Sequence, residues 1–251
     1  MAYTTINKST DNFRTKTYTG NSTNNTAITW DESTNMKPDF LWLKNRTLAQ
    51  EHWLCDVVRG ANYFSESDTS NAQQDGTGGF DSFNTNGFTV DNTARTNRNT
   101  MVGWGWKAGT SFSNSAGANG ASIASTGSIN TTAGFSIISY TGNGASSATI
   151  KHGLSSIPKM MIVKRLNSGA SWFVYHQALG ANNQLKLDVT EASSANQGAW
   201  NNTAPTSSLF TIGTADSVNA NNGTYIAYIF SEALGYSKFG SYTGNGNANG
   251  T

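Results

Sequence analysis

The sequence has little charge and a single cysteine. Only 12% of its 251 residues are charged, and the net charge is +1. A nucleic-acid-binding protein would show a basic face, so this balance argues against that class. Cys55 is the one cysteine, which excludes an intramolecular disulfide. We therefore expect stability to come from core burial or from assembly.

Two kinds of targeting segment are also missing. Residues 1–5 are not followed by the charged and apolar regions of a signal peptide. No apolar run approaches the length of a membrane span, which predicts a protein without membrane insertion. We expect the chain to be made and folded in a cytoplasm and, if it acts outside the cell, to be released by lysis.

Large aromatic side chains are plentiful. Seven Trp, nine Tyr and twelve Phe supply the apolar groups that a disordered chain lacks. They occur in a background rich in Gly, Asn, Thr and Ser, a composition common in extracellular β-proteins and viral fibres. The length suits two domains, each able to bury its own core.

One short motif occurs three times. Tyr-Thr-Gly-Asn begins at Tyr18, at Tyr140 and at Tyr242. The surroundings of the first two copies recur as well, because residues 40–44 and 53–56 match residues 160–164 and 173–176 at an offset of 120. Such recurrence in register indicates an internal repeat. Two units are therefore present, and a third has barely begun.

The strongest predicted strands are short and apolar on nearly every residue. They form a hairpin at residues 40–44 and 53–58, and its equivalent lies at residues 160–165 and 172–177. Continuous apolar runs of this length are typical of strands covered on both faces. We predict an all-β fold of two tandem antiparallel β-sandwich repeats, jelly-roll or concanavalin-like, with the terminal strand of a third unit. A closed barrel would alternate more evenly, and a propeller would need more and shorter repeats.

The repeat predicts the domain organisation. Residues 13–109 and 135–235 are the two β-sandwich repeats, and residues 110–134 are a flexible Gly/Ser/Asn-rich linker by composition. Residues 1–12 are an N-terminal arm, either a frayed terminus or a segment that attaches to a partner. Residues 236–251 either start a third repeat or pack as a strand on the second.

Catalytic chemistry finds little support. A sandwich-type glycosidase needs two carboxylates facing each other across a cleft, and the candidates are Asp39, Glu51 and Asp56. Their equivalents in the second repeat are Lys159, Ser171 and His176. An active site shared by both repeats is therefore excluded; a site confined to the first repeat stays the alternative, and we predict no catalytic residues.

Metal and cofactor sites find no support either. The histidines His52, His152 and His176 stand alone, without the spacing of ligands that a zinc or iron site requires. Residues 142–144, Gly-Asn-Gly, are not followed by the helix of a phosphate-binding loop. We expect neither a metal nor a cofactor.

A carbohydrate could be bound by exposed tryptophans, which stack on sugar faces. Most of the tryptophans lie in predicted strands and align with apolar residues of the other repeat, which indicates core packing. Trp30 and Trp200 lie next to turns instead, and Asn201 and Asn202 follow Trp200. We predict these four as ligand-binding residues.

Several motifs together suggest a family. They are Tyr-Thr-Gly-Asn, residues 38–46 (Pro-Asp-Phe-Leu-Trp-Leu-Lys-Asn-Arg), residues 58–60 (Val-Arg-Gly), residues 106–109 (Trp-Lys-Ala-Gly), residues 134–137 (Gly-Phe-Ser-Ile) and residues 200–208 (Trp-Asn-Asn-Thr-Ala-Pro-Thr-Ser-Ser). With them the chain resembles a repeat family of virion structural proteins, lectin/glucanase-like, from marine tailed phages and cyanophages. The resemblance covers nearly everything after residue 12 and brings no catalytic residues.

The resemblance implies a component of the virion. We expect a non-enzymatic fibre or surface decoration protein of the head or tail, homo-oligomeric, that contributes to host-surface or glycan attachment. Its partners would be other virion proteins, met through residues 1–12, and a host-surface glycan. A glycan-processing β-sandwich enzyme and a purely architectural virion protein are the alternatives.

Overall fold

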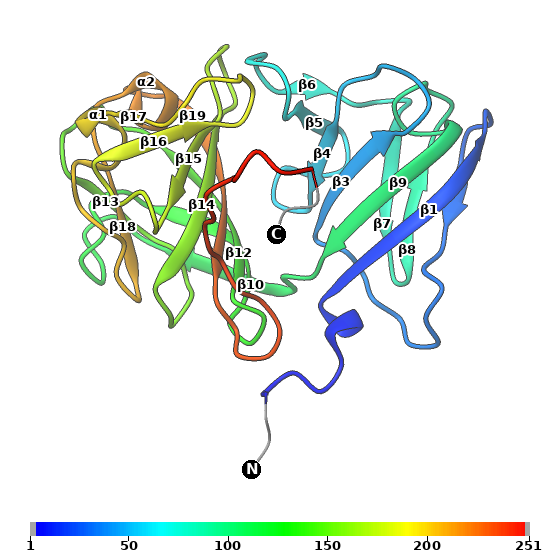
Figure 1. Cartoon of the computed structure of the whole chain (residues 1–251), viewed down its shortest axis with the longest axis horizontal. Helices are drawn as coiled ribbons and strands as arrows, with labels where there is room; N and C mark the ends of the chain where they lie inside the picture. Colours follow the sequence, from blue (N-terminus) through cyan, green and yellow to red (C-terminus); the bar gives the residue numbers. More distant parts are fainter. Residues whose placement is uncertain (1–3, 249–251) are drawn as a thin grey trace.

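The computed structural model describes residues 4–248 as an all-β chain (Figure 1). A six-stranded and an eight-stranded antiparallel sheet dominate it, accompanied by smaller sheets of three and two strands. The described helices are one turn each: η1 (Ser9–Asp11), α1 (Gln197–Trp200) and α2 (Asp216–Asn219). No helix in residues 4–248 is long and apolar enough to cross a bilayer.

The six-stranded sheet has the order β1-β9-β3-β4-β5-β6. Its strands are β1 (Phe13–Asn21), β9 (Arg98–Trp106), β3 (Phe40–Asn45), β4 (Trp53–Asp56), β5 (Tyr63–Glu66) and β6 (Gln74–Asp75). The three-stranded sheet β2-β8-β7 consists of β2 (Thr26–Ile28), β8 (Gly87–Val90) and β7 (Phe80–Asn84). We call these strands and their connections, residues 13–106, the first half.

The eight-stranded sheet has the order β10-β11-β12-β19-β14-β15-β16-β17. Its strands are β10 (Thr110–Asn114), β11 (Ser125–Asn130), β12 (Phe135–Thr141), β19 (Thr224–Ser231), β14 (Pro158–Arg165), β15 (Phe173–His176), β16 (Asn183–Lys186) and β17 (Ser194–Ala195). The two-stranded sheet pairs β13 (Ala148–Lys151) with β18 (Leu209–Ile212). These strands and their connections, residues 110–231, are the second half.

The two halves repeat one strand order. The order β1-β9-β3-β4-β5-β6 recurs as β12-β19-β14-β15-β16-β17, and the pair β2-β8 recurs as β13-β18. The register recurs as well: Leu43 faces Trp53 in the first half, and Val163 faces Phe173 in the second, each 120 positions later. The internal repeat predicted from the sequence is therefore a repeat of topology.

Each half has its own apolar core between its large and its small sheet. In the first half, Leu41 and Leu43 of β3 pack with Phe88 and Val90 of β8. These strands are apolar on both faces because the other face of the large sheet is also covered. Phe40 and Leu54 point away from the first core and pack with second-half residues such as Tyr228. Burial on both faces of the large sheet therefore explains why nearly every residue of the predicted hairpins is apolar.

The two large sheets meet through those outer faces, so the halves lie side by side (Figure 1). The ring of Phe40 stacks on that of Tyr228 with centroids 4.2 Å apart. Hydrogen bonds cross the junction too, since Trp172 donates its Nε1–H to the carbonyl of Glu66 at 2.8 Å. Lys164, which is buried, donates to the carbonyl of Ser70 at 3.0 Å.

The segment expected to be a flexible linker is part of the second sheet. Strand β11 pairs with β12 over six positions, and β10 pairs with β11 over five. Short side chains allow this arrangement: at Gly127 an added Cβ would lie 1.9 Å from the carbonyl oxygen of Ile137. The prediction of a linker at residues 110–134 was wrong, because Ser- and Thr-rich segments here form the edge strand β10 and its neighbour β11.

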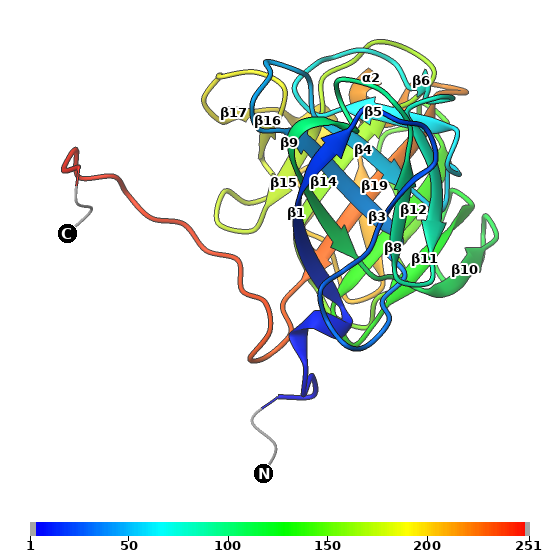
Figure 2. The same ribbon diagram turned by 90° about the vertical axis from the view of Figure 1, so that its right-hand side faces the viewer.

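The two terminal segments lie next to each other on the body. In residues 4–12, buried Ile6 packs with Ala133 and Ala233. After β19 an isolated bridge joins Ala233 to Ser237, and residues 238–248 then form no strand. Figure 2 shows this tail leaving the body. The expected terminal strand is therefore not formed in residues 236–248. The rest of the two predicted terminal segments, residues 1–3 and 249–251, lies outside the residues that the structure describes.

Candidate functional site: an aromatic groove between the halves

The Tyr-Thr-Gly-Asn motif has a structural role in both halves. The hydroxyls of Tyr18 and Tyr140 each donate to a backbone carbonyl, that of Thr96 in a turn at 2.6 Å and that of Val218 in α2 at 2.8 Å. The backbone N–H of the motif asparagine donates to Oδ1 of a fully buried asparagine, which is Asn97 in the first half and Asn219 in the second. In these two copies the motif therefore fixes the end of a strand to the segment that carries the buried asparagine.

Two of the predicted ligand-binding residues are core residues. Trp30 is 3% exposed and donates its Nε1–H to the carbonyl of Met36 at 2.8 Å. Trp200 is fully buried, and its ring meets that of Tyr175 edge-on. Neither indole face is open to a sugar, so the prediction was wrong for both. Nearby turns suggested a surface position, but each ring inserts into the core of its half.

The other two predicted residues shape a turn. Asn201 and Asn202 both adopt left-handed backbone conformations, with φ of 48° and 51°, directly after α1. Asparagine tolerates this region better than most residues do. The Asn201 amide donates to Ser147 Oγ at 2.7 Å, which fixes the turn. Trp200 beside them faces the core, so the structure does not bring the four predicted residues together as a site.

The acidic residues considered for catalysis all have structural partners. Asp56 is fully buried and accepts from Arg59 Nε at 2.5 Å and from the Tyr228 hydroxyl at 2.8 Å. Burial would lower the pKa of the Arg59 guanidinium, but the charge and hydrogen bond of Asp56, together with Tyr228 and Cys55, outweigh this effect and raise the pKa above its usual range. Glu51 pairs with Arg95 at 2.7 Å on the surface.

The three histidines lie apart and have local roles. His52 accepts a hydrogen bond from Trp42 Nε1 at 2.8 Å, and His152 is buried between the backbones of two loops. His176 Nδ1 accepts from the N–H of Ala178 at 3.2 Å. Within residues 4–248, no three His, Cys, Asp or Glu side chains cluster in a way that could hold a metal ion.

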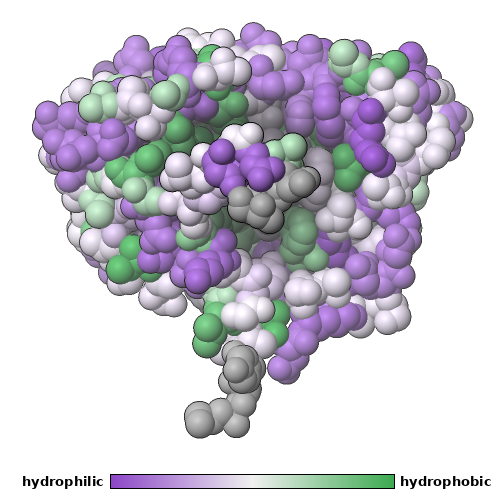
Figure 3. Space-filling view, viewed as in Figure 1, coloured by the Kyte–Doolittle hydropathy of each residue, from purple (hydrophilic) through white to green (hydrophobic). Residues whose placement is uncertain are grey.

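A groove of about 380 Å³ remains where the two large sheets diverge. Both halves line it with the same positions of the repeat. The four matched pairs are Phe13 with Phe135, Phe40 with Met160, Trp42 with Ile162, and Trp106 with Phe230. In Figure 3 hydrophobic residues lie at the floor of a hollow between the halves. The groove is thus a product of the repeat, since equivalent outer faces meet there without closing completely.

The aromatic rings in the groove support one another. The rings of Trp106 and Phe230 lie 6.5 Å apart across the groove. Each also contacts the first residue of the motif strand in its own half, because Phe13 lies 4.8 Å from Trp106 and Phe135 lies 4.9 Å from Phe230. Such clusters hold aromatic faces rigidly, which suits them to stacking on a ligand.

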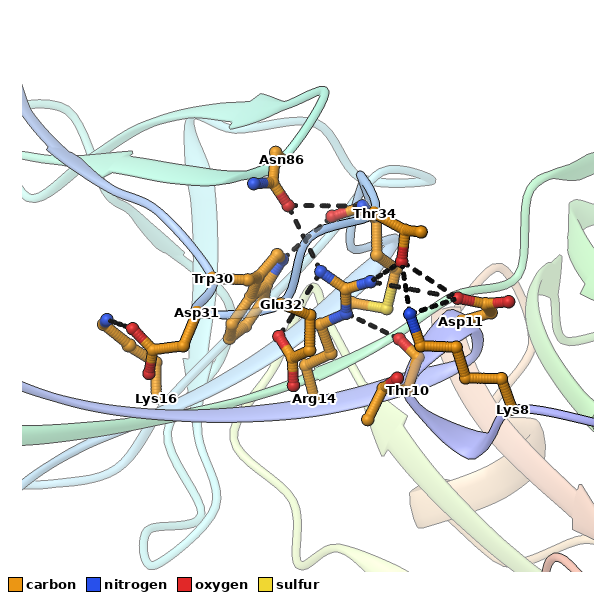
Figure 4. Close-up of polar contacts among 11 residues, drawn as sticks. Lys8, Thr10, Asp11, Arg14, Lys16, Trp30, Asp31, Glu32, Thr34 and Asn86 are labelled. Atoms are coloured by element: carbon orange, nitrogen blue, oxygen red, sulfur yellow. Dashed lines mark hydrogen bonds and ion pairs between the residues drawn. The ribbon is translucent and has the colours of Figure 1, made fainter.

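One wall of the groove comes from the N-terminal segment. Ser9 and Asn12 line it beside Phe13. The next residue, Arg14, has a fully buried side chain that donates from Nε to the carbonyl of Thr10 at 2.5 Å and from a terminal nitrogen to Thr34 Oγ1 at 3.0 Å. Figure 4 shows the guanidinium between η1 and the loop that carries Thr34. Arg14 thereby fixes the segment that borders the groove.

The opposite border is the start of the tail. Tyr236, Ser237 and Phe239 line the groove, and the ring of Phe239 lies 6.1 Å from that of Phe230. The backbone of Phe239 is held at both ends, since its N–H donates to Glu232 at 3.1 Å and its carbonyl accepts from Gln177 at 3.2 Å. Figure 3 shows the tail in front of the hollow.

Trp42 and Trp106 were predicted to be core residues, and the groove that they line was not predicted. Both lie in strands and match apolar residues of the second half, and that match was taken as evidence of burial. The half-buried state of these two rings depends on how the sheets diverge, which the pattern of one strand does not contain. The sequence did show that the four groove positions of the first half match apolar positions of the second half. That match does not distinguish a packed junction from an open one.

The comparisons with known proteins place the chain in a family without assigning a function. A family model described as a domain of unknown function, DUF7483, matches residues 8–251. The chain therefore belongs to the DUF7483 family. No curated protein and no solved structure matches it.

Proposed function

For this member of the DUF7483 family, we propose a non-enzymatic role as a structural protein of a phage particle. It would be a fibre or surface decoration component of the head or tail that contributes to host-surface or glycan attachment. The motif resemblance to virion proteins of marine tailed phages supports the setting. The aromatic groove between the halves supports the attachment role.

The convergence of equivalent positions on an open groove carries this proposal. A packed junction would bury all four matched pairs, yet the rings of Phe13, Trp42, Trp106 and Phe230 are only half-buried. Binding pockets are typically concave, mostly apolar and of about 300–1,000 Å³, with a few polar groups. Ser9, Asn12 and Ser237 supply such groups at the border of the groove. A sugar ring stacked on an indole would present its hydroxyls to them.

The enzyme alternative receives less support from the same groove. Glycoside hydrolysis uses two carboxylates about 5–10 Å apart on either side of the bond that is cleaved. The described residues that line the groove include no Asp, Glu or His. Asp56 and Glu51 are engaged with Arg59 and Arg95 instead. This distribution favours binding over cleavage.

Further features of the proposal concern the assembled particle. The chain would be homo-oligomeric, contact other virion proteins through residues 1–12, and reach the virion from the host cytoplasm, with release by lysis. We also propose that the two halves are jelly-roll or concanavalin-like sandwiches, with residues 236–251 starting a further repeat. Tyr242 is 94% exposed, unlike Tyr140 at 4%.

A glycan array tests the attachment role. The purified chain should bind a subset of glycans, and Trp42→Ala should weaken that binding at least about tenfold, because stacking on an aromatic ring is lost. Tyr63→Ala is the matched control, since Tyr63 is 44% exposed and does not line the groove. Release of sugar from a bound glycan, or equal loss of binding in both variants, would contradict the proposal.

A further inference from the structure

A second hollow, of about 410 Å³, lies at the junction of the halves and shares no lining residue with the aromatic groove. The first half contributes Lys37, Asp39, Val57 and Val58 to it. The other wall is the hairpin β10–β11, with Ser111, Phe112 and Thr126. We call this hollow the polar cleft.

A buried carboxylate lies in the wall of the polar cleft. Asp39 is 4% exposed, and its Oδ2 accepts from the N–H of Ala108 at 2.9 Å. Its Oδ1 accepts no hydrogen bond from residues 4–248. The backbone of Asp39 is fixed at both ends, by Trp106 at 2.8 Å and by Val57 at 2.9 Å. Burial raises the pKa of this carboxyl, and Lys37 and Lys107 oppose that shift.

The other lining groups suit a ligand that carries several hydroxyls. Lys37 is exposed and can donate, and the hydroxyls of Ser111 and Thr126 are exposed and can both donate and accept. Val57 and Val58, both half-buried, supply apolar contact beside these polar groups. A saccharide offers this combination of hydroxyls and an apolar C–H face.

The cleft arises from the asymmetry between the halves. The position equivalent to Asp39 in the second half is Lys159. The hairpin β10–β11 extends the second sheet beyond β12, whereas β1, the equivalent of β12, is the edge of its sheet. The carboxylate and the hydroxyl-bearing hairpin therefore meet at this junction and not at an equivalent place in the first half.

We propose that the polar cleft is a saccharide-binding site in which Asp39 Oδ1 accepts a hydrogen bond from a sugar hydroxyl. Lys37, Ser111 and Thr126 contact neighbouring hydroxyls, and Val57 and Val58 contact the C–H face. This site is separate from the aromatic groove and does not depend on binding there.

Backbone amide NMR on the whole chain tests the site with glucose, galactose, mannose and N-acetylglucosamine as separate probes. The N–H groups of Ala108 and Gly109 are built-in reporters, because they donate to Asp39 Oδ2 and to Ser128 Oγ. At least one sugar should shift both signals in a saturable way. Asp39→Asn should weaken that binding at least about tenfold, since a charged acceptor forms the stronger hydrogen bond.

Three variants make the result decisive. Ser111→Ala combined with Thr126→Ala changes exposed side chains, so it tests the site even if Asp39→Asn impairs folding. Asp75→Asn, at an exposed carboxylate outside the cleft, should bind like the parent chain. Trp42→Ala should also leave these shifts intact, which separates this site from the groove. Absence of saturable shifts at Ala108 and Gly109 with all four sugars would overturn the proposal, as would undiminished binding in both cleft variants.

Discussion

The glycine of the repeated motif is the residue that the fold constrains most directly. At Gly142 an added Cβ would lie 2.5 Å from the carbonyl oxygen of Ala220, and at Gly20 it would lie 2.2 Å from the carbonyl carbon of Asn97. At both glycines the motif strand lies too close to the backbone around Asn97 or Asn219 to leave room for a side chain. In the third copy, an added Cβ at Gly244 would meet nothing within 4 Å.

Alanine substitution should separate these copies. Gly142→Ala should destabilise the chain by about 1–3 kcal/mol, the usual cost of forcing an extra group into packed structure. Gly244→Ala is the same change in the same motif and should have an effect below about 0.5 kcal/mol. Urea unfolding of both variants measures the difference. Equal effects would mean that the motif does not pack as described.

His152 predicts a pH dependence of stability. Burial lowers the pKa of this histidine from 6.5 to about 4 in the folded chain. The unfolded chain therefore binds a proton that the folded chain does not, so stability falls as the pH drops from about 6.5 towards 4. The loss should approach about 3 kcal/mol at the end of that range.

The variant His152→Asn isolates this contribution. Its side-chain oxygen can still accept from the N–H of Leu154, as His152 Nδ1 does at 3.2 Å. The free energy of unfolding should decline less steeply for the variant than for the parent chain between pH 6.5 and 4.5. Parallel curves for the two proteins would show that His152 is already protonated in the folded state or is accessible to water.

The repeat predicted correctly which residues of the two halves are equivalent. The exposure of individual side chains was predicted less well. Trp30 and Trp200 were taken as exposed because turns adjoin them, yet both are buried. Trp42 was predicted to be buried because it lies in a strand and matches an apolar residue of the second repeat, yet it borders the groove. Neighbours in sequence describe the backbone near a side chain, whereas its exposure depends on which distant strand packs over it.

At the scale of elements, the hairpin strands of both halves were predicted closely. The expected strand at residues 40–44 is β3 (Phe40–Asn45), and that at residues 160–165 lies within β14 (Pro158–Arg165). Strands β10 and β11 were missed, because their Ser, Thr and Gly side chains resemble a linker by composition. Pairing with β12 gives these residues their structure, and no local pattern in the sequence indicates such pairing.

Hydrogen exchange distinguishes a strand from a linker at residues 125–130. Amides of β11 that bond to β10 or β12 should exchange much more slowly than amides of residues 240–247, which form no strand. Both segments are rich in small polar residues, namely Gly, Ser, Thr and Asn, so residues 240–247 are a suitable internal comparison. Equally rapid exchange in both segments would restore the linker interpretation.

At the scale of the whole molecule, the junction combines stacked rings with a buried ion pair. Tyr228 belongs to the second half, and its hydroxyl contacts Asp56 at 2.8 Å and Arg59 at 3.1 Å in the first half. Buried hydrogen-bonded charges are costly to leave unpaired, so this contact fixes the relative position of the two sheets. The groove depends on that position.

Removing the Tyr228 hydroxyl tests the junction. Tyr228→Phe should destabilise the chain by about 1–3 kcal/mol, because Asp56 and Arg59 each lose a buried partner. Tyr63→Phe, at an exposed tyrosine, should be close to neutral. Thermal unfolding of both variants provides the comparison, and a neutral Tyr228→Phe would mean that the ion pair does not contribute to joining the halves.

Cryo-electron microscopy of phage particles that carry this chain tests the central proposal most directly. We expect density for both halves on the outside of the head or tail, with the groove between Trp42 and Phe230 facing away from the particle and accessible to host glycans. A chain that is absent from the particle, or whose groove is buried against another virion protein, would contradict the attachment role.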